Sequence, residues 1–272
     1  MRTIRLFAFI AVWVLLGPTT LNAQNEEKTP KYITRTTMHW NMDKEDFSMK
    51  DWKAMEKEYL DKVVMKNEHI LGASFFMHQF TSDNTTLEYV QVFDSWDAIE
   101  KASERNSELA KEAWPDDDAR REFFQKRNDY YGNEHSDEIY SIMDGGKPLA
   151  EKPTKDLTLY LRISHFAFPK DGTSKEWKEL RDSRLEHVVH KNEHILGYYP
   201  SSHYYGGDRT EFIEAFYVED LAALDKMLDR LPELAKEAWS EEEREDRWNR
   251  GRKYYTGKHE DYIYTLVSGL SK

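Results

Sequence analysis

The sequence of 272 residues contains no cysteine, which excludes disulfide bridges, thiolate nucleophiles and metal sites with cysteine ligands. It is also poor in positive charge, because 39 lysine and arginine residues face 51 acidic ones, for a formal net charge of −12. A nucleic-acid-binding protein needs a basic surface to neutralise phosphates, and a protein that adheres to anionic membranes needs one too. The composition therefore argues against both partners. Aromatic residues make up 14% of the chain, enough for a buried core.

Long apolar runs are scarce, and the clearest one lies at the amino terminus. Residues 6–16 are apolar, follow Arg2 and Arg5, and precede a Gly17-Pro18 break and a small residue at Ala23. The run is shorter than the roughly 20 residues that span a bilayer. We therefore expect residues 1–24 to be a secretory signal peptide. The mature chain is then exported, periplasmic or secreted, with no membrane span.

The rest of the chain is an internal duplication. The segment 66–72 recurs unchanged as 191–197, and the segment 108–114 recurs unchanged as 233–239. A period this long indicates two domain-sized repeats, not a solenoid of short units. We predict a first α+β repeat, a linker rich in turn-forming and charged residues, and a second α+β repeat. Their boundaries are 25–146, 147–154 and 155–272.

Each repeat predicts the order β-α-β-β-α-β. In the second repeat, apolar residues alternate over 157–166 as in a strand, and Thr173-x-x-Glu176 is a capping box that begins a helix. Two aromatic-rich strands, a polar helical stretch interrupted at Pro115 in the first repeat, and a final strand follow. The final strands are expected at 139–143 and 263–267.

This order resembles the dimeric α+β barrels, a ferredoxin-like superfamily that includes small monooxygenases, haem-degrading enzymes and polyketide cyclases. Met38-His39-Trp40 and Ser164-His165-Phe166 are similar to the early-strand histidine of its cyclase-like and stress-responsive branch. The segment 92–98 resembles the strand-to-helix joint of the superfamily. The resemblance implies an α+β fold whose sheets pair into a barrel around a pocket. The pairing is either within one chain or across a homodimer.

Eight of the ten histidines form matched pairs between the repeats: His39/His165, His69/His194, His78/His203 and His135/His259. Two of these pairs lie in strands with apolar or aromatic neighbours, where an imidazole needs a partner or lines a cavity. We predict that the four histidines of these two pairs face a pocket and act in acid–base catalysis, with a structural role as the alternative. These four are His39, His78, His165 and His203.

The other two histidine pairs are expected at the ends of elements. His69 and His194 are predicted in the last turn of a helix, either binding a ligand or interacting with free carbonyl groups there. His135 and His259 are predicted as turn residues before the last strand of each repeat.

The third strand of each repeat carries a polar residue between aromatic ones. The triples are Tyr89, Gln91, Phe93 and Phe212, Glu214, Phe216. In a barrel interior such residues would contact a ligand, with Glu214 as a catalytic carboxylate. The alternative is a polar residue that faces solvent.

Three functions are therefore open. The first is binding of a small apolar or planar molecule in an aromatic- and histidine-lined barrel pocket, with or without histidine catalysis. The second is a haem or metal binder using the same pocket, with a paired histidine as axial ligand; no particular metal ligands are predicted. The third is a non-catalytic interaction module of the cell envelope.

Overall fold

The computed structural model describes residues 28–272. The predicted signal peptide at 1–24 lies outside these residues. No helix within 28–272 combines the length and the apolar character that a membrane crossing requires.

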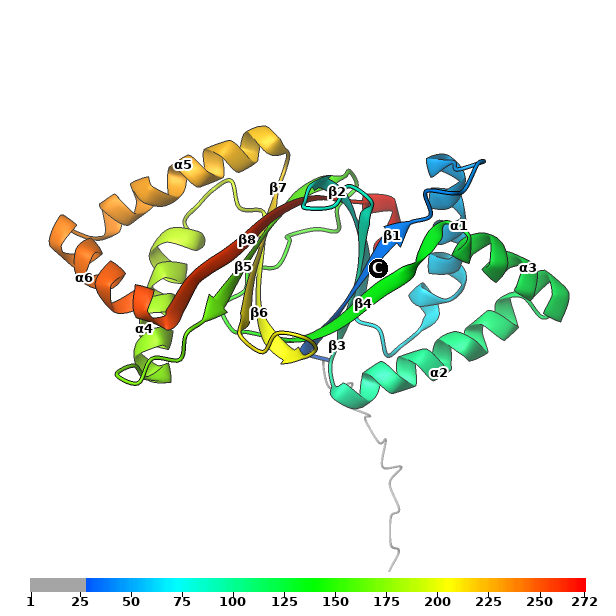
Figure 1. The fold of residues 1–272 in the computed structure, drawn as a ribbon, viewed down its shortest axis with the longest axis horizontal. Coiled ribbons are helices and arrows are strands. Elements are labelled where there is room, and N and C mark those ends of the chain that lie inside the picture. Colours follow the sequence, from blue (N-terminus) through cyan, green and yellow to red (C-terminus); the bar gives the residue numbers. More distant parts are fainter. Residues whose placement is uncertain (1–27) are drawn as a thin grey trace, which may run out of the picture.

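The first half has the predicted element order (Figure 1). Its elements are β1 (Tyr32–Trp40), α1 (Met49–Lys62), the 3₁₀ turn η1 (Val64–Lys66), β2 (Gly72–Phe80), β3 (Thr86–Phe93), α2 (Trp96–Ala113), α3 (Asp117–Asn128) and β4 (Tyr131–Ile142).

The second half repeats this order and adds short turns. Its elements are β5 (Leu157–Phe166), α4 (Ser174–Arg184), the π turn η2 (Leu185–Val189), β6 (Gly197–Tyr205), β7 (Glu211–Val218), α5 (Leu221–Ala238), α6 (Glu241–Gly251), the 3₁₀ turn η3 (Arg252–Tyr254), β8 (Tyr255–Leu266) and the 3₁₀ turn η4 (Ser268–Leu270).

Side-chain caps explain where the helices begin. Ser48 accepts a hydrogen bond from the backbone of Asp51 at the start of α1, and Thr173 accepts one from Glu176 at the start of α4. The reciprocal capping box occurs at Ser240 and Glu243 instead, at the start of α6. The Glu176 side chain turns away from Thr173 to accept hydrogen bonds from other residues.

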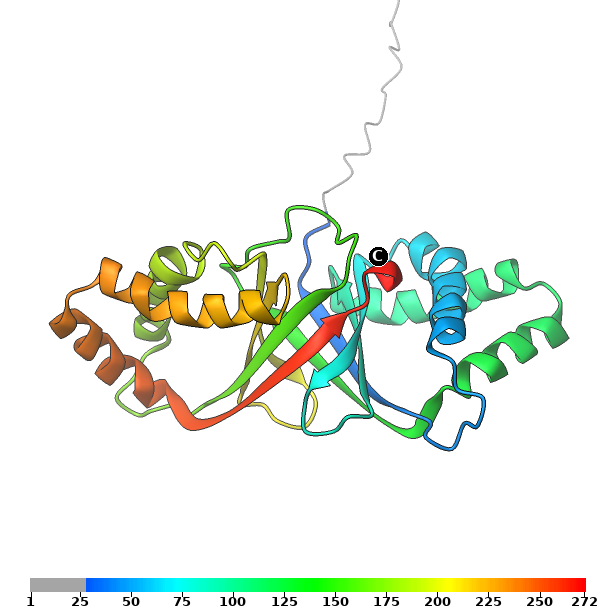
Figure 2. The ribbon, with the colours of Figure 1, turned by 90° about the horizontal axis from the view of Figure 1, so that it is seen from above.

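All eight strands form one closed antiparallel barrel in the order β1-β3-β2-β8-β5-β7-β6-β4. The two halves meet where β2 pairs with β8 and where β4 pairs with β6, for example at Phe76 opposite Leu266. The helices of each half cover the outside of the barrel on two opposite sides (Figures 1 and 2). The predicted α+β class and paired sheets are confirmed, and the pairing is within one chain.

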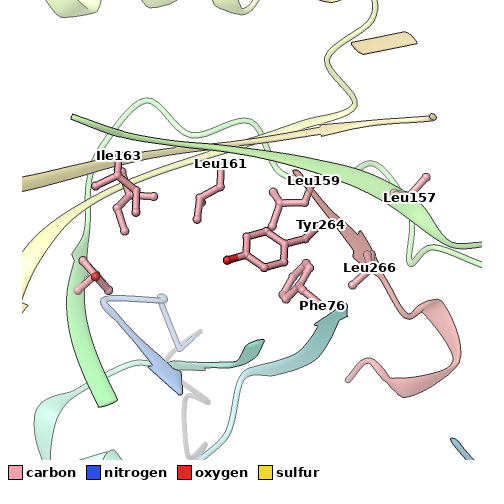
Figure 3. Packing of buried hydrophobic residues seen from close by; sticks show 9 residues of the cluster. Phe76, Leu157, Leu159, Leu161, Ile163, Tyr264 and Leu266 are labelled. Atoms are coloured by element: carbon pink, nitrogen blue, oxygen red, sulfur yellow. The ribbon is translucent and has the colours of Figure 1, made fainter. Parts of the chain in front are cut away.

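Two apolar layers result, because each sheet has one face in the barrel and one under helices. The interior layer includes Leu159, Leu161 and Ile163 of β5, which share the inner face with Tyr264 of the neighbouring strand β8 and Phe76 of β2 (Figure 3). Separate clusters fill the space between each sheet and its helices. Both faces of the strands are therefore largely buried.

The last strand of each half is longer than predicted. Because β4 begins at Tyr131 and β8 at Tyr255, His135 and His259 lie inside strands, not in turns. The amino-terminal part of each strand pairs with β1 or β5 through the backbone while its side chains stay mostly exposed. It therefore has no apolar alternation that sequence analysis could detect.

Candidate ligand site

The four strand histidines gather at one end of the barrel. Neighbouring strands are antiparallel, so β1, β2, β5 and β6 run in the same direction. Each histidine lies near the carboxyl end of its strand, on the face that points into the barrel. The loops after β2 and β6 lie at this end (Figure 2).

Hydrogen bonds hold three of these histidines. The His39 Nδ1 is 3.0 Å from the Thr85 hydroxyl, and the His78 Nδ1 is 2.7 Å from the Thr81 hydroxyl. His165 is held on both nitrogens, 3.0 Å from the Thr210 hydroxyl and 2.9 Å from a Glu260 carboxylate oxygen.

His203 differs from the others. Its Nε2 is buried without a hydrogen-bond partner and lies 4.0 Å from a Glu138 oxygen. The catalytic role of the four histidines stays a prediction.

The barrel interior also holds a buried ion pair that was not predicted from the sequence. Arg35 of β1 donates to Glu88 of β3 at 2.8 Å, and the Tyr264 hydroxyl donates to the same carboxylate at 3.0 Å. Burial alone would lower the pKa of Arg35, but the Glu88 carboxylate outweighs this and raises it well above its ordinary value. Both residues alternate along their strands with other inward-facing residues. That spacing in the sequence could have placed them in the interior.

The third-strand triples do not face the barrel interior, which corrects the prediction for Tyr89, Gln91 and Phe93. Phe93 packs among Leu60 and Ile70 under the helices of the first half, with Tyr89 beside them. Since Tyr89, Gln91 and Phe93 alternate on one strand, all three share this outer face. The inward positions of β3 belong to the even-numbered residues, including Glu88.

The second triple, Phe212, Glu214 and Phe216, is on the outer face for the same reason, so Glu214 cannot assist the barrel histidines. Glu214 accepts a hydrogen bond from Arg184 of α4 at 2.7 Å and one from the Tyr198 hydroxyl at 2.7 Å. Burial by itself would raise the pKa of Glu214, but Arg184 and Tyr198 outweigh burial and lower it. Glu214 is therefore held ionised, unlike a group that exchanges protons near neutral pH.

The pairing register also corrects the match between the triples. Thr36 of β1 lies opposite Tyr89, and Arg162 of β5, at the corresponding position, lies opposite Glu214. Glu214 therefore corresponds to Tyr89 and not to Gln91.

His69 and His194 lie in turns before β2 and β6, not in a last helical turn, at the opposite end of these strands from His78 and His203. The Asn67 side chain accepts from the His69 backbone N–H at 3.0 Å and donates to the Ala102 carbonyl at 2.8 Å. The residues shared by the two copies of this segment therefore stabilise the turn. A ligand role for the two imidazoles stays a prediction.

A cavity of about 490 Å³ lies between the outer sheet face of the second half and helices α4, α5 and α6. Aromatic rings and guanidinium groups form most of its lining, and among the residues named as sites from the sequence it includes only Phe212 and Glu214. The aromatic residues are Trp177, Phe212, Trp239, Trp248 and Tyr255. The arginines are Arg162, Arg181, Arg184, Arg244 and Arg247.

Two further hollows, of about 620 and 640 Å³, have mainly polar and charged linings and lie along helix surfaces. The aromatic lining distinguishes the third cavity, which we call the α6 pocket. From the sequence, this part of the second half was expected only to be a polar helical stretch. Trp248 between Arg247 and Arg250 was the signal that could have found it.

Hydrogen bonds fix the walls of the α6 pocket. The Trp177 Nε1 donates to the Tyr255 hydroxyl at 3.0 Å, and burial raises the pKa of Tyr255 to about 12. Arg247 lies over the Trp239 ring at 4.1 Å and donates to the Leu180 carbonyl at 3.0 Å. Within residues 28–272 no carboxylate pairs with Arg244 or Arg247, so the pocket presents unbalanced positive charge.

The α6 pocket does not fit haem. Its lining contains no histidine, cysteine or methionine to serve as an axial ligand, and its Tyr255 hydroxyl already accepts a hydrogen bond from Trp177. His187 lies outside the lining, against Trp239 with ring centres 5.8 Å apart. Among the described residues, no group of three or more potential ligands is placed to hold a metal ion.

The fold is similar to that of several solved structures. A protein from Fusobacterium nucleatum, provisionally named a monooxygenase, matches with a TM-score of 0.55 and 12% identity over 88% of this chain and 93% of that chain. An anthrone oxidase-like protein matches with a TM-score of 0.51 and 10% identity over 91% and 94% of the two chains. A protein provisionally named a chlorite dismutase matches with a TM-score of 0.51 and 14% identity over 89% and 97%. No family model and no curated protein matches the sequence.

At these identities the likeness establishes the fold alone. These neighbours are α+β barrel proteins, so the predicted resemblance is confirmed at that level.

Proposed function

We propose that this chain binds a small, largely planar organic molecule in the α6 pocket. The observation that carries the proposal is the cavity of about 490 Å³ walled by five aromatic side chains. Concave sites of this size with mostly apolar walls and a few polar groups are typical of small-molecule binding. The names of two neighbours, a monooxygenase and an anthrone oxidase-like protein, refer to chemistry that fits an organic ligand.

The walls favour a flat ligand. Aromatic rings attract one another in offset or edge-to-face arrangements, and a guanidinium over a ring adds a cation–π contribution. Trp177 and Phe212 already meet edge to face, with centres 5.8 Å apart. The strand histidines face the barrel interior on the other side of the sheet, so a ligand in this pocket would not contact them. We therefore propose binding here without histidine catalysis.

Filling the pocket tests the proposal. Gly251 lines the pocket, and a β-carbon added there meets no atom within 4 Å. We expect uncharged naphthamide to bind the wild-type chain, with a change in tryptophan fluorescence, and to bind Gly251→Arg at least about tenfold more weakly. The control is Asn128→Arg, which adds the same side chain at an exposed position of α3. Equal binding by all three proteins would contradict the proposal.

We also propose that the chain is exported, on the basis of the basic and apolar residues at 1–24. Expression of the full sequence in a Gram-negative host should give a periplasmic product whose mass corresponds to cleavage near Ala23. An unprocessed product that stays in the cytoplasm would contradict this.

A further inference from the structure

The two halves differ in charge at one pair of buried positions. In the first half, the Glu56 carboxylate of α1 is 1% exposed and accepts a hydrogen bond from the Tyr131 hydroxyl at 2.6 Å. Arg127 of α3 donates to the same carboxylate at 3.0 Å. The site is therefore complete in itself, with an anion, a cation and a hydroxyl donor.

In the second half, Arg181 stands where Glu56 stands in the first. Trp52 and Trp177 fix this match, because each lies one helical turn before the position and each donates to a tyrosine hydroxyl, at 2.9 Å and 3.0 Å. The exchange replaces a buried carboxylate by a buried guanidinium.

Gly251 stands where Arg127 stands in the first half. Arg120 of α3 donates to the Trp114 carbonyl at 2.9 Å, and Arg244 of α6 donates to the Trp239 carbonyl at 2.6 Å, which aligns the two helices. In that alignment Arg127 matches Gly251. The second half therefore lacks a carboxylate at this position of α4 and the α6 side chain that would cover it. Its buried carboxylate in the pocket, Glu214, comes from β7 and is already paired with Arg184 and Tyr198.

Two hydrogen-bond donors are consequently left over in the α6 pocket. Arg181 is 7% exposed, and its nearest carboxylate contact is 3.5 Å from Asp182. One Nη atom donates to the Asp144 carbonyl, whereas the Nε is buried without a partner. The Tyr255 hydroxyl accepts from Trp177 as Tyr131 accepts from Trp52, but no acceptor for its proton lies within hydrogen-bond distance in the described part of the chain. A buried donor without an acceptor, such as the Arg181 Nε, costs free energy, and an anion beside it and the Tyr255 hydroxyl would supply the missing acceptor.

We infer that the ligand of the α6 pocket is an aromatic or otherwise planar carboxylate, whose anionic group takes the place that Glu56 fills in the first half. It accepts hydrogen bonds from the Tyr255 hydroxyl and the Arg181 guanidinium, while its flat body lies against the tryptophans. This inference rests on the proposed function of the same pocket and adds the charge of the ligand.

The first half cannot bind a second molecule in the same way. Arg127 lies over the Tyr59 ring at 4.3 Å, and Phe123 stacks on Trp114 with centres 4.1 Å apart. Arg127 fills the space that is open beside Gly251 in the second half, and Phe123 takes the place of Arg247. One ligand binds per chain.

The test compares naphthoate with uncharged naphthamide of the same ring by calorimetric titration of the full chain. We expect one site per chain and a preference for naphthoate of at least about tenfold in the wild type. In Arg181→Gln the preference disappears while naphthamide still binds. Tyr255→Phe reduces the preference, whereas the matched Tyr131→Phe, which removes the same hydroxyl from the first half, leaves it unchanged.

A double variant keeps the test decisive if single changes at Arg181 impair folding. Arg181→Glu with Gly251→Arg copies the carboxylate and the arginine of the first half, so it should fold and bind neither compound. Equal affinity of the wild type for both compounds, or an undiminished preference in Arg181→Gln, would overturn the inference but leave the proposed function standing. No binding of either compound to the wild type would overturn both.

Discussion

Glu176 shows how one carboxylate can join three elements. It accepts hydrogen bonds from the Tyr254 hydroxyl, from Arg250 at 3.0 Å and from Lys253 at 3.1 Å. The Tyr254 hydrogen bond, followed by those from Arg250 and Lys253, lowers the pKa of Glu176 from its ordinary 4.5 to about 2. The charged form is therefore the one that the folded state favours.

A pH dependence follows from this shift. Because the folded-state pKa of Glu176 is below the unfolded value, its contribution to the free energy of unfolding is present above pH 4.5 and is lost as the pH falls towards 2. We expect Glu176→Gln to be less stable than the wild type at neutral pH, with the difference shrinking under acid conditions. Urea unfolding at several pH values measures this. Glu179→Gln, whose carboxylate is 60% exposed, is the control, and a pH-independent difference would contradict the prediction.

The buried strand histidine of the second half offers a second test at this scale. The His165 side chain is 5% exposed and has hydrogen-bond partners on both nitrogens. His165→Ala leaves Glu260 and Thr210 without this partner, so we expect a loss of about 1–3 kcal/mol in the free energy of unfolding. Denaturant melts check this against His135→Ala, whose side chain is 59% exposed and whose loss should cost under about 0.5 kcal/mol. Equal effects would contradict the hydrogen-bond argument.

The sequence predicted for some strands, but not for others, which residues face the barrel interior. In β5 the run from Leu157 to His165 alternates clearly, so its inward face was identified correctly. In β3 and β7 both faces are buried, one in the barrel and one under helices, so alternation could not tell them apart. The α6 pocket was missed because it depends on contacts between α4, α6 and the sheet, which no single segment encodes.

At the scale of elements, α6 ends at Gly251, a residue without a side chain, and the α6 pocket is open beside it. Gly251 has helical backbone angles, φ −76° and ψ −42°, which any residue can adopt. A glycine in such a conformation costs stability because the unfolded chain has more freedom to lose.

We therefore expect Gly251→Ala to raise the free energy of unfolding by about 0.4–1 kcal/mol. The added β-carbon meets no atom within 4 Å, so no clash offsets the gain. Denaturant unfolding of the two proteins measures the difference. A destabilised variant would mean that the backbone at the end of α6 is not free to accept a side chain.

Element order was predictable, and element ends were less so. Capping residues and Pro115 placed the helices, because local side chain–backbone hydrogen bonds and the missing proline N–H determine where helices begin and break. The early parts of β4 and β8 were missed because backbone pairing with a neighbouring strand, and not an apolar pattern, makes them extended.

At the scale of the whole molecule, the interior layer belongs to both halves. Phe76 and Tyr140 of the first half pack with Leu159 and Leu161 of the second. Neither half has this layer alone, and each would expose the strand edges that now meet at β2–β8 and β4–β6.

We expect the isolated halves, 28–146 and 155–272, to lack a cooperatively folded monomer. Co-expression of the two halves should restore a one-to-one complex, because the same strand edges are then available. Light scattering after size exclusion and near-ultraviolet circular dichroism would detect it. A monomeric half with a sharp melting transition would contradict this prediction.

Closure within one chain was not predictable from the sequence. The same strand pattern satisfies pairing between repeats of one chain and pairing between two chains, because the edge hydrogen bonds are the same in both. Only the observed β2–β8 and β4–β6 registers distinguish them.

Covalent continuity between the halves has a genetic consequence. A barrel assembled from two identical subunits inherits every substitution twice, so a change that opens one side also opens the other. In a single chain, separate codons of the gene specify the two sides, so glycine at 251 can coexist with arginine at 127. One side can then change towards ligand binding while the other keeps the close packing that supports the barrel strands common to both.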